Sequence, residues 1–252
     1  MKLSELTWEE AKAFNAKLIL LPIGSIEQHG YHLPLNNDTF VAEKLADCIA
    51  SSMNARGCPT LVAPCIPVGL SGHHMAFYGS LTLSTETFQA VVREVCISLG
   101  QHGLRNIIIV NGHGGNSAAL RKAIASFPGT IQASLLEYWR HLTPDSINEI
   151  ESAFFCHACE GETSLSLALG QLAHMDRAVC NYPTGDYSAY NLLNGTGEIN
   201  GPLPPIHTIS PSGVIGDSTL ANKRKGERIL SALMPEMLAT LTDRLELCGH
   251  GK

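Results

Sequence analysis

Short apolar segments alternate along this chain with longer segments in which apolar residues recur at helical spacing. The clearest short segment, Asn106 to Val110, reads Asn-Ile-Ile-Ile-Val, and β-branched residues of this kind favour a buried strand. A second continuous apolar run covers residues 17–23. Between them, Val41, Leu45 and Ile49 repeat at the spacing of one helix face. This alternation predicts a three-layer α/β/α fold around a mostly parallel sheet.

Local signals define the expected elements more closely. Thr7 and Glu10 have the spacing of a capping box, and Gly57 and Gly103 stand where helices are expected to end. We expect strands at residues 17–23, 60–68, 106–110 and 130–138, and helices at residues 7–14, 38–56, 85–102, 116–125, 163–174 and 217–247.

The expected elements belong to one domain over residues 1–252. Of these 252 residues 44% are hydrophobic and 16% are charged, a balance typical of a globular protein with a substantial core. Residues 181–216 depart from the alternation because they are dense in Gly, Pro, Asn and Ser. A long irregular segment of this kind is often a lid or a binding loop, so we expect it to fold over the main body.

Charge and hydropathy exclude several classes of function. The net charge of −6 leaves no broad positive field for a nucleic acid. The longest apolar run, Leu18 to Ile23, is far shorter than the roughly 18 residues that span a bilayer. Residues 1–10 lack the basic start and apolar stretch of a signal peptide, so we expect a cytoplasmic protein without a membrane partner.

Eight cysteines in such a chain are expected to be reduced thiols packed as small hydrophobic residues. Cys156 and Cys159 are the exception, since a C-x-x-C pair could be a redox pair or half of a zinc site. A structural zinc site would need a second closely spaced Cys/His pair, and the chain offers no obvious one.

Side chains that bind metals are concentrated where the expected strands end. Glu27, His29 and Asp38 follow the first strand, and His113 follows the strand at 106–110. The carboxyl ends of parallel strands meet at one edge of a sheet, so these loops could converge. Carboxylates with imidazoles suit zinc, manganese or ferrous iron. A third loop adds residues 157–162, with His157, Glu160 and Glu162, which is enough for a site of two metals.

Simpler interpretations remain open for each of these groups. Asp38 could serve only as a helix N-cap, and Glu160 and Glu162 could simply favour the positive end of the following helix. The turn at residues 112–117 could cradle a phosphate, although it lacks the third glycine of a G-x-G-x-x-G loop. A metal-free nucleotide-binding α/β protein is therefore one alternative.

Three of these segments, in order, resemble the motifs of the creatininase (creatinine amidohydrolase) family. The segment 21–30, which reads Leu-Pro-Ile-Gly-Ser-Ile-Glu-Gln-His-Gly, resembles the opening motif when taken with Asp38. Residues 111–116 and 157–164 resemble the second and third motifs, and residues 210–217 resemble a segment before the last helix. The resemblance implies a single α/β/α domain, a homo-oligomer, most often a hexamer, and a dinuclear divalent-metal centre that hydrolyses carbon–nitrogen bonds of amides.

The resemblance also implies roles for individual residues. Glu27 and His113 would bind one metal, His29 would bind the other, and Asp38 would bridge the two. His157 would lie beside the metals as a proton donor. Zinc is the expected metal, with manganese or iron as alternatives.

Two departures from the family pattern bear on the substrate. Creatinine-cleaving members have a glutamate ligand at the position of Gly115, so Glu162 is assigned as the remaining ligand, as in the glycine-type branch of the family. They also have a tryptophan shortly before the third-motif histidine, where this chain has residues 152–156, Ser-Ala-Phe-Phe-Cys. The glycine-type branch includes deformylases of pyrimidine intermediates and peptidases that mature redox-cofactor precursors. We assign His74 and Gly115 to substrate binding.

The predicted function is therefore metal-dependent hydrolysis of an amide, formamide or cyclic amide by a hydroxide that bridges two divalent ions. His157 would protonate the departing nitrogen, a role that suits an imidazole titrating near neutral pH. The alternatives are a peptidase acting on a small peptide precursor and a non-catalytic module that binds a small ligand on the same fold.

Overall fold

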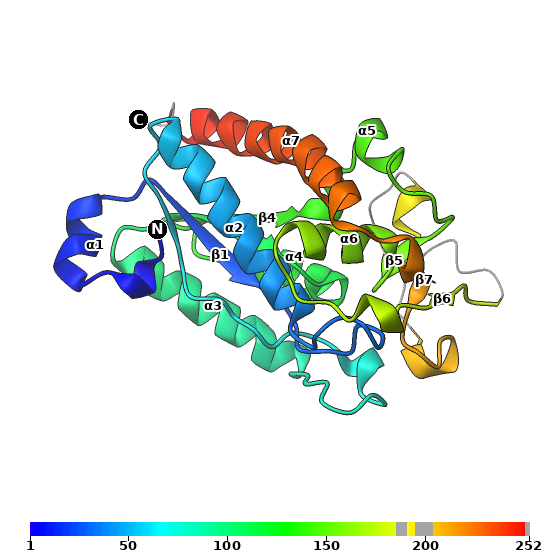
Figure 1. The fold of residues 1–252 in the computed structure, drawn as a ribbon. Coiled ribbons are helices and arrows are strands. Elements are labelled where there is room, and N and C mark those ends of the chain that lie inside the picture. The colour runs from blue at the N-terminus through cyan, green and yellow to red at the C-terminus, as the bar shows by residue number, and fades with distance from the viewer. Residues whose placement is uncertain (185–190, 195–203, 250–252) are drawn as a thin grey trace. The chain divides into compact units, whose positions relative to one another are not determined.

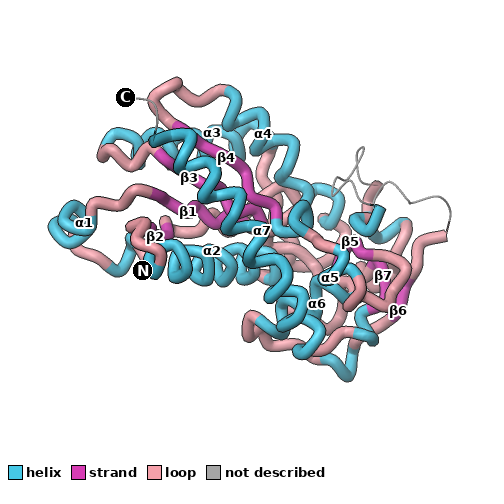
Figure 2. The backbone as a smooth tube through the Cα atoms, turned by 90° about the horizontal axis from the view of Figure 1, so that it is seen from above, coloured by secondary structure: helices cyan, strands magenta, loops and turns pink. Residues whose placement is uncertain are grey.

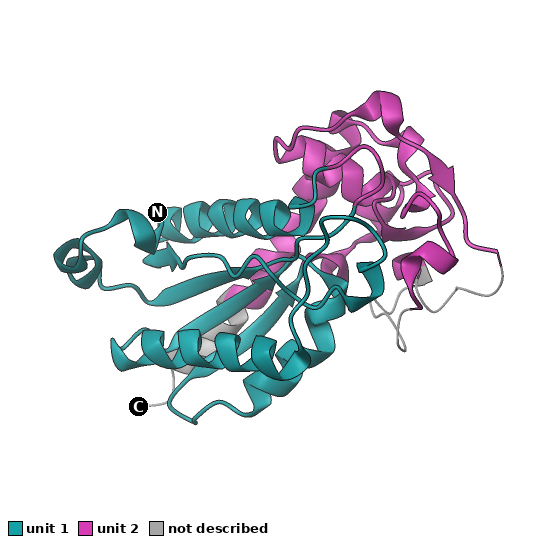
Figure 3. Ribbon diagram, turned by 90° about the horizontal axis from the view of Figure 1, so that it is seen from below, with its two compact units in different colours: residues 1–28, 34–137 teal, residues 29–33, 138–252 magenta. Residues whose placement is uncertain are grey.

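A computed structural model describes residues 1–184, 191–194 and 204–249, which form two compact units (Figure 3). Unit 1 comprises Met1–Gln28 and Pro34–Glu137. Unit 2 comprises His29–Leu33 and Tyr138–Lys252. The short segment His29–Leu33 thus belongs by its contacts to the second unit, although it interrupts the first in sequence.

The centre of unit 1 is a four-stranded parallel sheet in the order β2-β1-β3-β4 (Figure 2). Every residue of the two central strands is buried except Asn106 at the start of β3, as expected for strands covered on both faces. Ile23 at the end of β1 pairs with Asn111 at the end of β3, so the loops that follow begin at the same edge. The strands are β1 (Leu18–Ile23), β2 (Thr60–Val62), β3 (Asn106–Asn111) and β4 (Gln132–Glu137).

Helices cover both faces of this sheet (Figure 1). Alternate β1 residues, Ile19, Leu21 and Ile23, form one core with apolar residues of α3 and α4. The helix α2 contacts β1, β2 and β3. The predicted α/β/α fold with a mostly parallel sheet is therefore confirmed. The helices of unit 1 are α1 (Trp8–Phe14), α2 (Asn37–Ala55), α3 (Thr85–Gln101) and α4 (Ser117–Ala125).

Local sequence signals explain most element boundaries in unit 1. The side chain of Thr7 accepts from the backbone of Glu10 and completes the predicted capping box of α1. The strand β2 ends at Val62, before the predicted 68, because Pro64 and Pro67 lack the backbone N–H that a continuing ladder needs. The N-cap of α2 is Asn36, so Asp38 lies inside the first turn and is not the cap.

Unit 2 contains a small antiparallel sheet that the sequence did not predict. Its order is β5-β7-β6, and its strands have only two or three residues, too few to show a periodic pattern. The strands are β5 (Phe155–His157), β6 (Cys180–Asn181) and β7 (Ile215–Asp217), and the helices are α5 (Pro144–Ile147), α6 (Glu160–Ala168) and α7 (Lys223–Gly249).

The last two helices begin and end elsewhere than predicted. The helix α6 covers Glu160–Ala168, whereas the prediction was 163–174, and Gly170 with φ of 95° lies just past its end. The helix α7 starts at Lys223 because residues 215–217 form β7. Gly226 of α7 packs so closely on α6 that a Cβ atom would lie 1.8 Å from the Ser164 carbonyl oxygen.

Part of the predicted irregular loop at 181–216, namely residues 185–190 and 195–203, lies outside the described residues. In the described part of the chain no helix has the length and apolarity to cross a membrane. The predicted boundaries of a single domain, 1–252, stay a prediction.

Candidate metal centre

Unit 1 brings three of the predicted ligands together at the edge where its strands end. Glu27 follows β1, His113 follows β3, and Asp38 lies in the first turn of α2. All three side chains are buried, and one potential ligand atom from each lies within 4.8 Å of the others. A Cβ atom at Gly112 would lie only 2.2 Å from the Asp38 carbonyl oxygen, so this glycine permits the close approach of β3 and α2. Tight packing is therefore sufficient to account for a glycine at position 112, and phosphate binding is not needed to explain it.

The imidazole of His113 faces both carboxylates with the same nitrogen. Its Nδ1 lies 3.3 Å from Glu27 Oε1 and 3.1 Å from Asp38 Oδ2. Its Nε2 lies 3.1 Å from the carbonyl oxygen of Leu70, which can only accept a hydrogen bond. The ring therefore donates Nε2–H to Leu70, and in a neutral imidazole the Nδ1 lone pair points at two negative groups.

That arrangement requires a positive charge between the three side chains. Burial lowers the pKa of His113, but the charges of Glu27 and Asp38 and their hydrogen bonds outweigh it and hold the pKa well above its ordinary value. A proton on Nδ1 leaves two buried carboxylates against one positive charge. A divalent ion bound by two oxygens and one nitrogen balances the charge better, and these donors suit zinc, manganese or ferrous iron. The residues therefore fit a divalent metal.

An amide and carboxylate network behind His113 holds its loop in place. The backbone N–H of His113 donates to Asn111 Oδ1 at 3.1 Å, and Asn116 Nδ2 donates to the same oxygen at 3.3 Å. The buried Glu137 accepts from Asn111 Nδ2 at 3.4 Å and from Arg121 at 2.7 Å. The contacts of Glu137 with Asn111 and Arg121 were not predicted, because these residues lie on different strands and helices.

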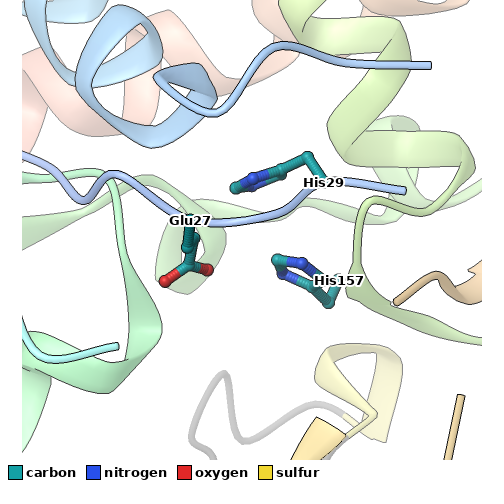
Figure 4. Close-up of side chains that lie close together, drawn as sticks. All are labelled: Glu27, His29 and His157. Carbon is teal, nitrogen blue, oxygen red and sulfur yellow. The ribbon is translucent and has the colours of Figure 1, made fainter. Parts of the chain in front are cut away.

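Unit 2 brings together His29, His157 and Glu162, and Figure 4 shows the two imidazoles of this group. His29 Nε2 lies 3.4 Å from Glu162 Oε1, and both side chains are buried. The rings of His29 and His157 have centroids 4.4 Å apart and are tilted by 46°. His157 ends β5 and is half-buried, and Glu162 lies in the first turn of α6. A carboxylate and an imidazole thus adjoin a second imidazole that is partly accessible.

The turn between β5 and α6 aims a backbone donor at Glu162. The amide N–H of Ala158 donates to Glu162 Oε2 at 2.5 Å. Ala158 has φ of 49°, a left-handed conformation that costs a residue with a side chain about 1 kcal/mol or more. The turn therefore orients Glu162 at the expense of backbone strain.

The two glutamates of this turn have different surroundings. Glu160 accepts from the backbone N–H of Ser152 at 2.6 Å and from Lys225 Nζ of α7. These contacts join the start of α6 to α7 and to the segment before β5, and the interpretation of Glu160 as an acid that favours the helix N-terminus stays a prediction. Glu162 also contacts His29, so its place at the helix N-terminus does not fully account for a glutamate at this position.

His32 is a further buried residue of unit 2, to which the sequence analysis assigned no role. Its Nε2 lies 2.9 Å from Thr163 Oγ1, next to Glu162, and its carbonyl oxygen accepts from the backbone N–H of His174 at 2.8 Å. Burial and the neighbouring His29 lower the pKa of His32 to about 4. A neutral His32 therefore fixes the segment that carries His29 to the start of α6.

The two residues assigned to substrate binding both lie beside the proposed ligands, and their assignment stays a prediction. His74 is buried, and its Nε2 lies 3.2 Å from Glu27 Oε1. A Cβ atom at Gly115 would lie 2.4 Å from His113 Nε2 and 2.7 Å from the Leu70 carbonyl oxygen. A glutamate ligand at position 115 is therefore incompatible with this arrangement of His113 and Leu70.

The C-x-x-C pair is not a metal site in the described part of the chain. Cys156 and Cys159 are free thiols, and no cluster of candidate ligands among the described residues contains a cysteine. Burial raises the pKa of the Cys159 thiol to about 12, so it is held as an unreactive thiol.

Comparison with known proteins gives a consistent result. A family model described as "Creatininase: Creatinine amidohydrolase" matches residues 4–241 and so extends over both units. The chain is 31% identical over 224 residues to a mycofactocin precursor peptide peptidase of Mycobacterium tuberculosis, covering 86% of this chain and 82% of that protein. It is 29% identical over 249 residues to a creatinine amidohydrolase of Pseudomonas putida, covering 90% of each. A solved structure titled "Creatininase Mn" matches with a TM-score of 0.74 and 26% identity, over 96% of this chain and 98% of that one.

Proposed function

This chain belongs to the creatininase family, and on that premise we propose that it hydrolyses an amide bond of a small molecule with the help of two divalent metal ions. The predicted activity as a hydrolase of carbon–nitrogen bonds agrees with the family and with relatives named as an amidohydrolase and a peptidase. The observation that carries the metal proposal is His113, whose Nε2 is committed to Leu70 while Nδ1 faces Glu27 and Asp38.

The proposed ligand sets follow the two units. Glu27, Asp38 and His113 would hold one ion, and His29 with Glu162 would hold the other. Asp38 as a ligand shared by both ions stays a prediction. When bound, a pair of divalent ions supplies Lewis acidity and lowers the pKa of water toward neutrality. Zinc is the proposed metal, with manganese or iron as alternatives.

His157 is the residue proposed to move a proton. Cleavage of a carbon–nitrogen bond leaves a basic nitrogen that must take up a proton, and an imidazolium N–H of His157 would donate it. The ring lies against His29 and is half-buried, so it combines closeness to a ligand with access from outside.

The proposed substrate is an amide, formamide or cyclic amide other than creatinine, because position 115 has no space for the glutamate of creatinine-cleaving members. A second candidate is cleavage of a small peptide precursor. It is favoured by the relative named as a mycofactocin precursor peptide peptidase. The glycine-type branch of the family stays a prediction.

Metal content tests this proposal directly. Protein purified without a metal-affinity step is expected to contain close to two equivalents of zinc, manganese or iron by elemental mass spectrometry. Glu27→Ala is expected to lose at least one equivalent and to lose turnover of amide and peptide substrates. The exposed residue Glu86 in the first turn of α3 provides the matched control, since Glu86→Ala should keep both metals.

Protein that stays metal-free after incubation with each ion would contradict the proposal and favour a non-catalytic module that binds a small ligand. Metal-loaded protein that turns over none of the amides, formamides, lactams or peptides tested would favour the same alternative.

A further inference from the structure

Two side chains of one neighbouring loop, Ser71 and His74, lie against the carboxylate of Glu27. Ser71 Oγ donates to Glu27 Oε2 at 2.6 Å, and His74 Nε2 lies 3.2 Å from Glu27 Oε1. All three side chains are buried. Glu27 Oε2 thus accepts a hydrogen bond, and the His74 imidazole nitrogen lies close to Oε1.

Gln28 determines which nitrogen of His74 carries the proton. Its Nε2 lies 2.9 Å from His74 Nδ1, and an amide NH2 group can only donate. Nδ1 therefore accepts, and the hydrogen of the neutral ring is on Nε2, which faces Glu27. The opposite tautomer would point an Nε2 lone pair at the carboxylate.

The backbone keeps both donors at fixed positions. Ser71 and His74 begin and end a single turn, closed by a hydrogen bond of 2.9 Å from the N–H of His74 to the carbonyl oxygen of Ser71. The N–H of Ser71 donates to Thr82 Oγ1 at 3.0 Å, and the N–H of Gln28 donates to Ser80 Oγ at 3.2 Å. These backbone hydrogen bonds therefore fix the positions of Gln28 and His74 beside Glu27.

We propose that His74 is a positioning residue, which orients Glu27 for a divalent ion through a tautomer that Gln28 selects, and not a substrate-binding residue. This inference rests on the proposed function, in which Glu27 is a ligand. A neutral donor orients the carboxylate without cancelling its charge, so Glu27 keeps its full attraction for the cation. Partners of metal ligands of this kind commonly contribute about 10- to 100-fold to metal affinity.

Titration of metal-free protein with Mn²⁺ tests the inference, with the free ion measured by electron paramagnetic resonance. His74→Ala is expected to weaken the site that contains Glu27 by about 10- to 100-fold while the other site keeps its affinity. His74→Gln retains an N–H donor near Nε2 and should recover most of the loss. His102→Ala removes an exposed imidazole at the end of α3 and should bind as the wild type does.

Gln28→Met keeps the imidazole and removes only the donor to Nδ1, so it tests the inference even where His74→Ala does not fold. We expect a severalfold loss of Mn²⁺ affinity at the same site, with Gln101→Met, an exposed position in α3, as its control. Wild-type affinity at both sites in His74→Ala and in Gln28→Met would overturn the inference and leave the proposed function intact. Failure of the wild type to bind Mn²⁺ would overturn both.

Discussion

At the scale of single residues, the centre depends on imidazoles whose two ring nitrogens have different partners. His113 gives Nε2–H to the Leu70 carbonyl and turns Nδ1 toward the carboxylates. His74 Nδ1 accepts a hydrogen bond from Gln28 Nε2, and His74 Nε2 faces Glu27. In each ring, the partner of one nitrogen fixes the tautomer. The other nitrogen of His113 therefore presents a lone pair to the carboxylates, and that of His74 presents an N–H to Glu27.

His157 provides the clearest test at this scale. His157→Ala removes a half-buried imidazole that lies beside His29 but outside the proposed ligand sets, so metal content should stay at the wild-type level. Turnover is expected to fall by about 10²- to 10⁴-fold, the usual contribution of a general acid. Parallel measurements of metal content and kcat check both parts.

A matched comparison is His113→Ala, which should lose metal and activity together. Near wild-type kcat in His157→Ala would show that the proton comes from another group.

At the scale of elements, short segments between regular structure carry most of the chemistry. Glu27 precedes α2, His113 directly follows β3, and Glu162 lies at the start of α6. The segment His29–Leu33 belongs to unit 2 and is held there by His32, through Thr163 and His174. Gly30, with φ of 65°, allows the turn, and a Cβ atom there would lie 2.6 Å from Val214. Each proposed ligand therefore owes its position to a neighbouring element.

The buried His32 predicts a pH-dependent contribution to stability. Its pKa is lowered to about 4 in the folded chain, whereas the ordinary value is 6.5. Between these values the unfolded chain binds more protons than the folded chain, so stability rises with pH across this window. His32 thus lowers the free energy of unfolding as the pH falls from 6.5 to 4, by up to about 3 kcal/mol.

The measurement is urea unfolding of wild type and His32→Asn across that pH range, on metal-free protein. The difference between the two free energies of unfolding should shift in favour of the variant as the pH falls. A difference that stays constant from pH 6.5 to 4 would show that His32 is not held neutral in the fold.

At the scale of the molecule, the parallel sheet of unit 1 brings close together side chains that are far apart in sequence. Paired strands β1 and β3 end at the same edge, which places Glu27 close to His113 across more than eighty residues of chain. Glu27 and Asp38 place negative charge in a buried environment, so we expect the metal-free protein to be less stable than the metal-bound protein. The predicted homo-oligomer, a hexamer, and the cytoplasmic location stay predictions.

Metal removal should therefore destabilise the whole chain. A ligand present at 100 times its Kd stabilises by about 2.7 kcal/mol, which corresponds to a rise in Tm of roughly 5 to 10 °C for a chain of this size. Scanning calorimetry of chelator-treated protein with and without Mn²⁺ measures this rise. It should shrink as the pH falls, because a proton on His113 Nδ1 competes with the ion.

Glu27→Ala should reduce the rise in Tm. An equal rise in the wild type and in Glu27→Ala would indicate that Mn²⁺ binds away from the proposed centre.

The sequence by itself determined the α/β/α class, most element boundaries of unit 1 and the identity of the family. Apolar periodicity, capping residues and glycines act within a few residues of chain, so they can be recognised without coordinates. Glu27, Asp38 and His113 could be named as candidate ligands because they follow the expected strands, although Asp38 as an N-cap was excluded only by the structure. The family motifs then added roles that the spacing alone left open.

Only the tertiary structure decided how these groups are held. His113 donates to the carbonyl oxygen of Leu70, Glu27 lies against Ser71 and His74, and the His29 segment is joined to Thr163 through His32. The strands of unit 2 are too short for any periodic signal. The choice of one tautomer, the burial of charge and close packing depend on contacts between distant parts of the chain, so they arise only once the chain has folded.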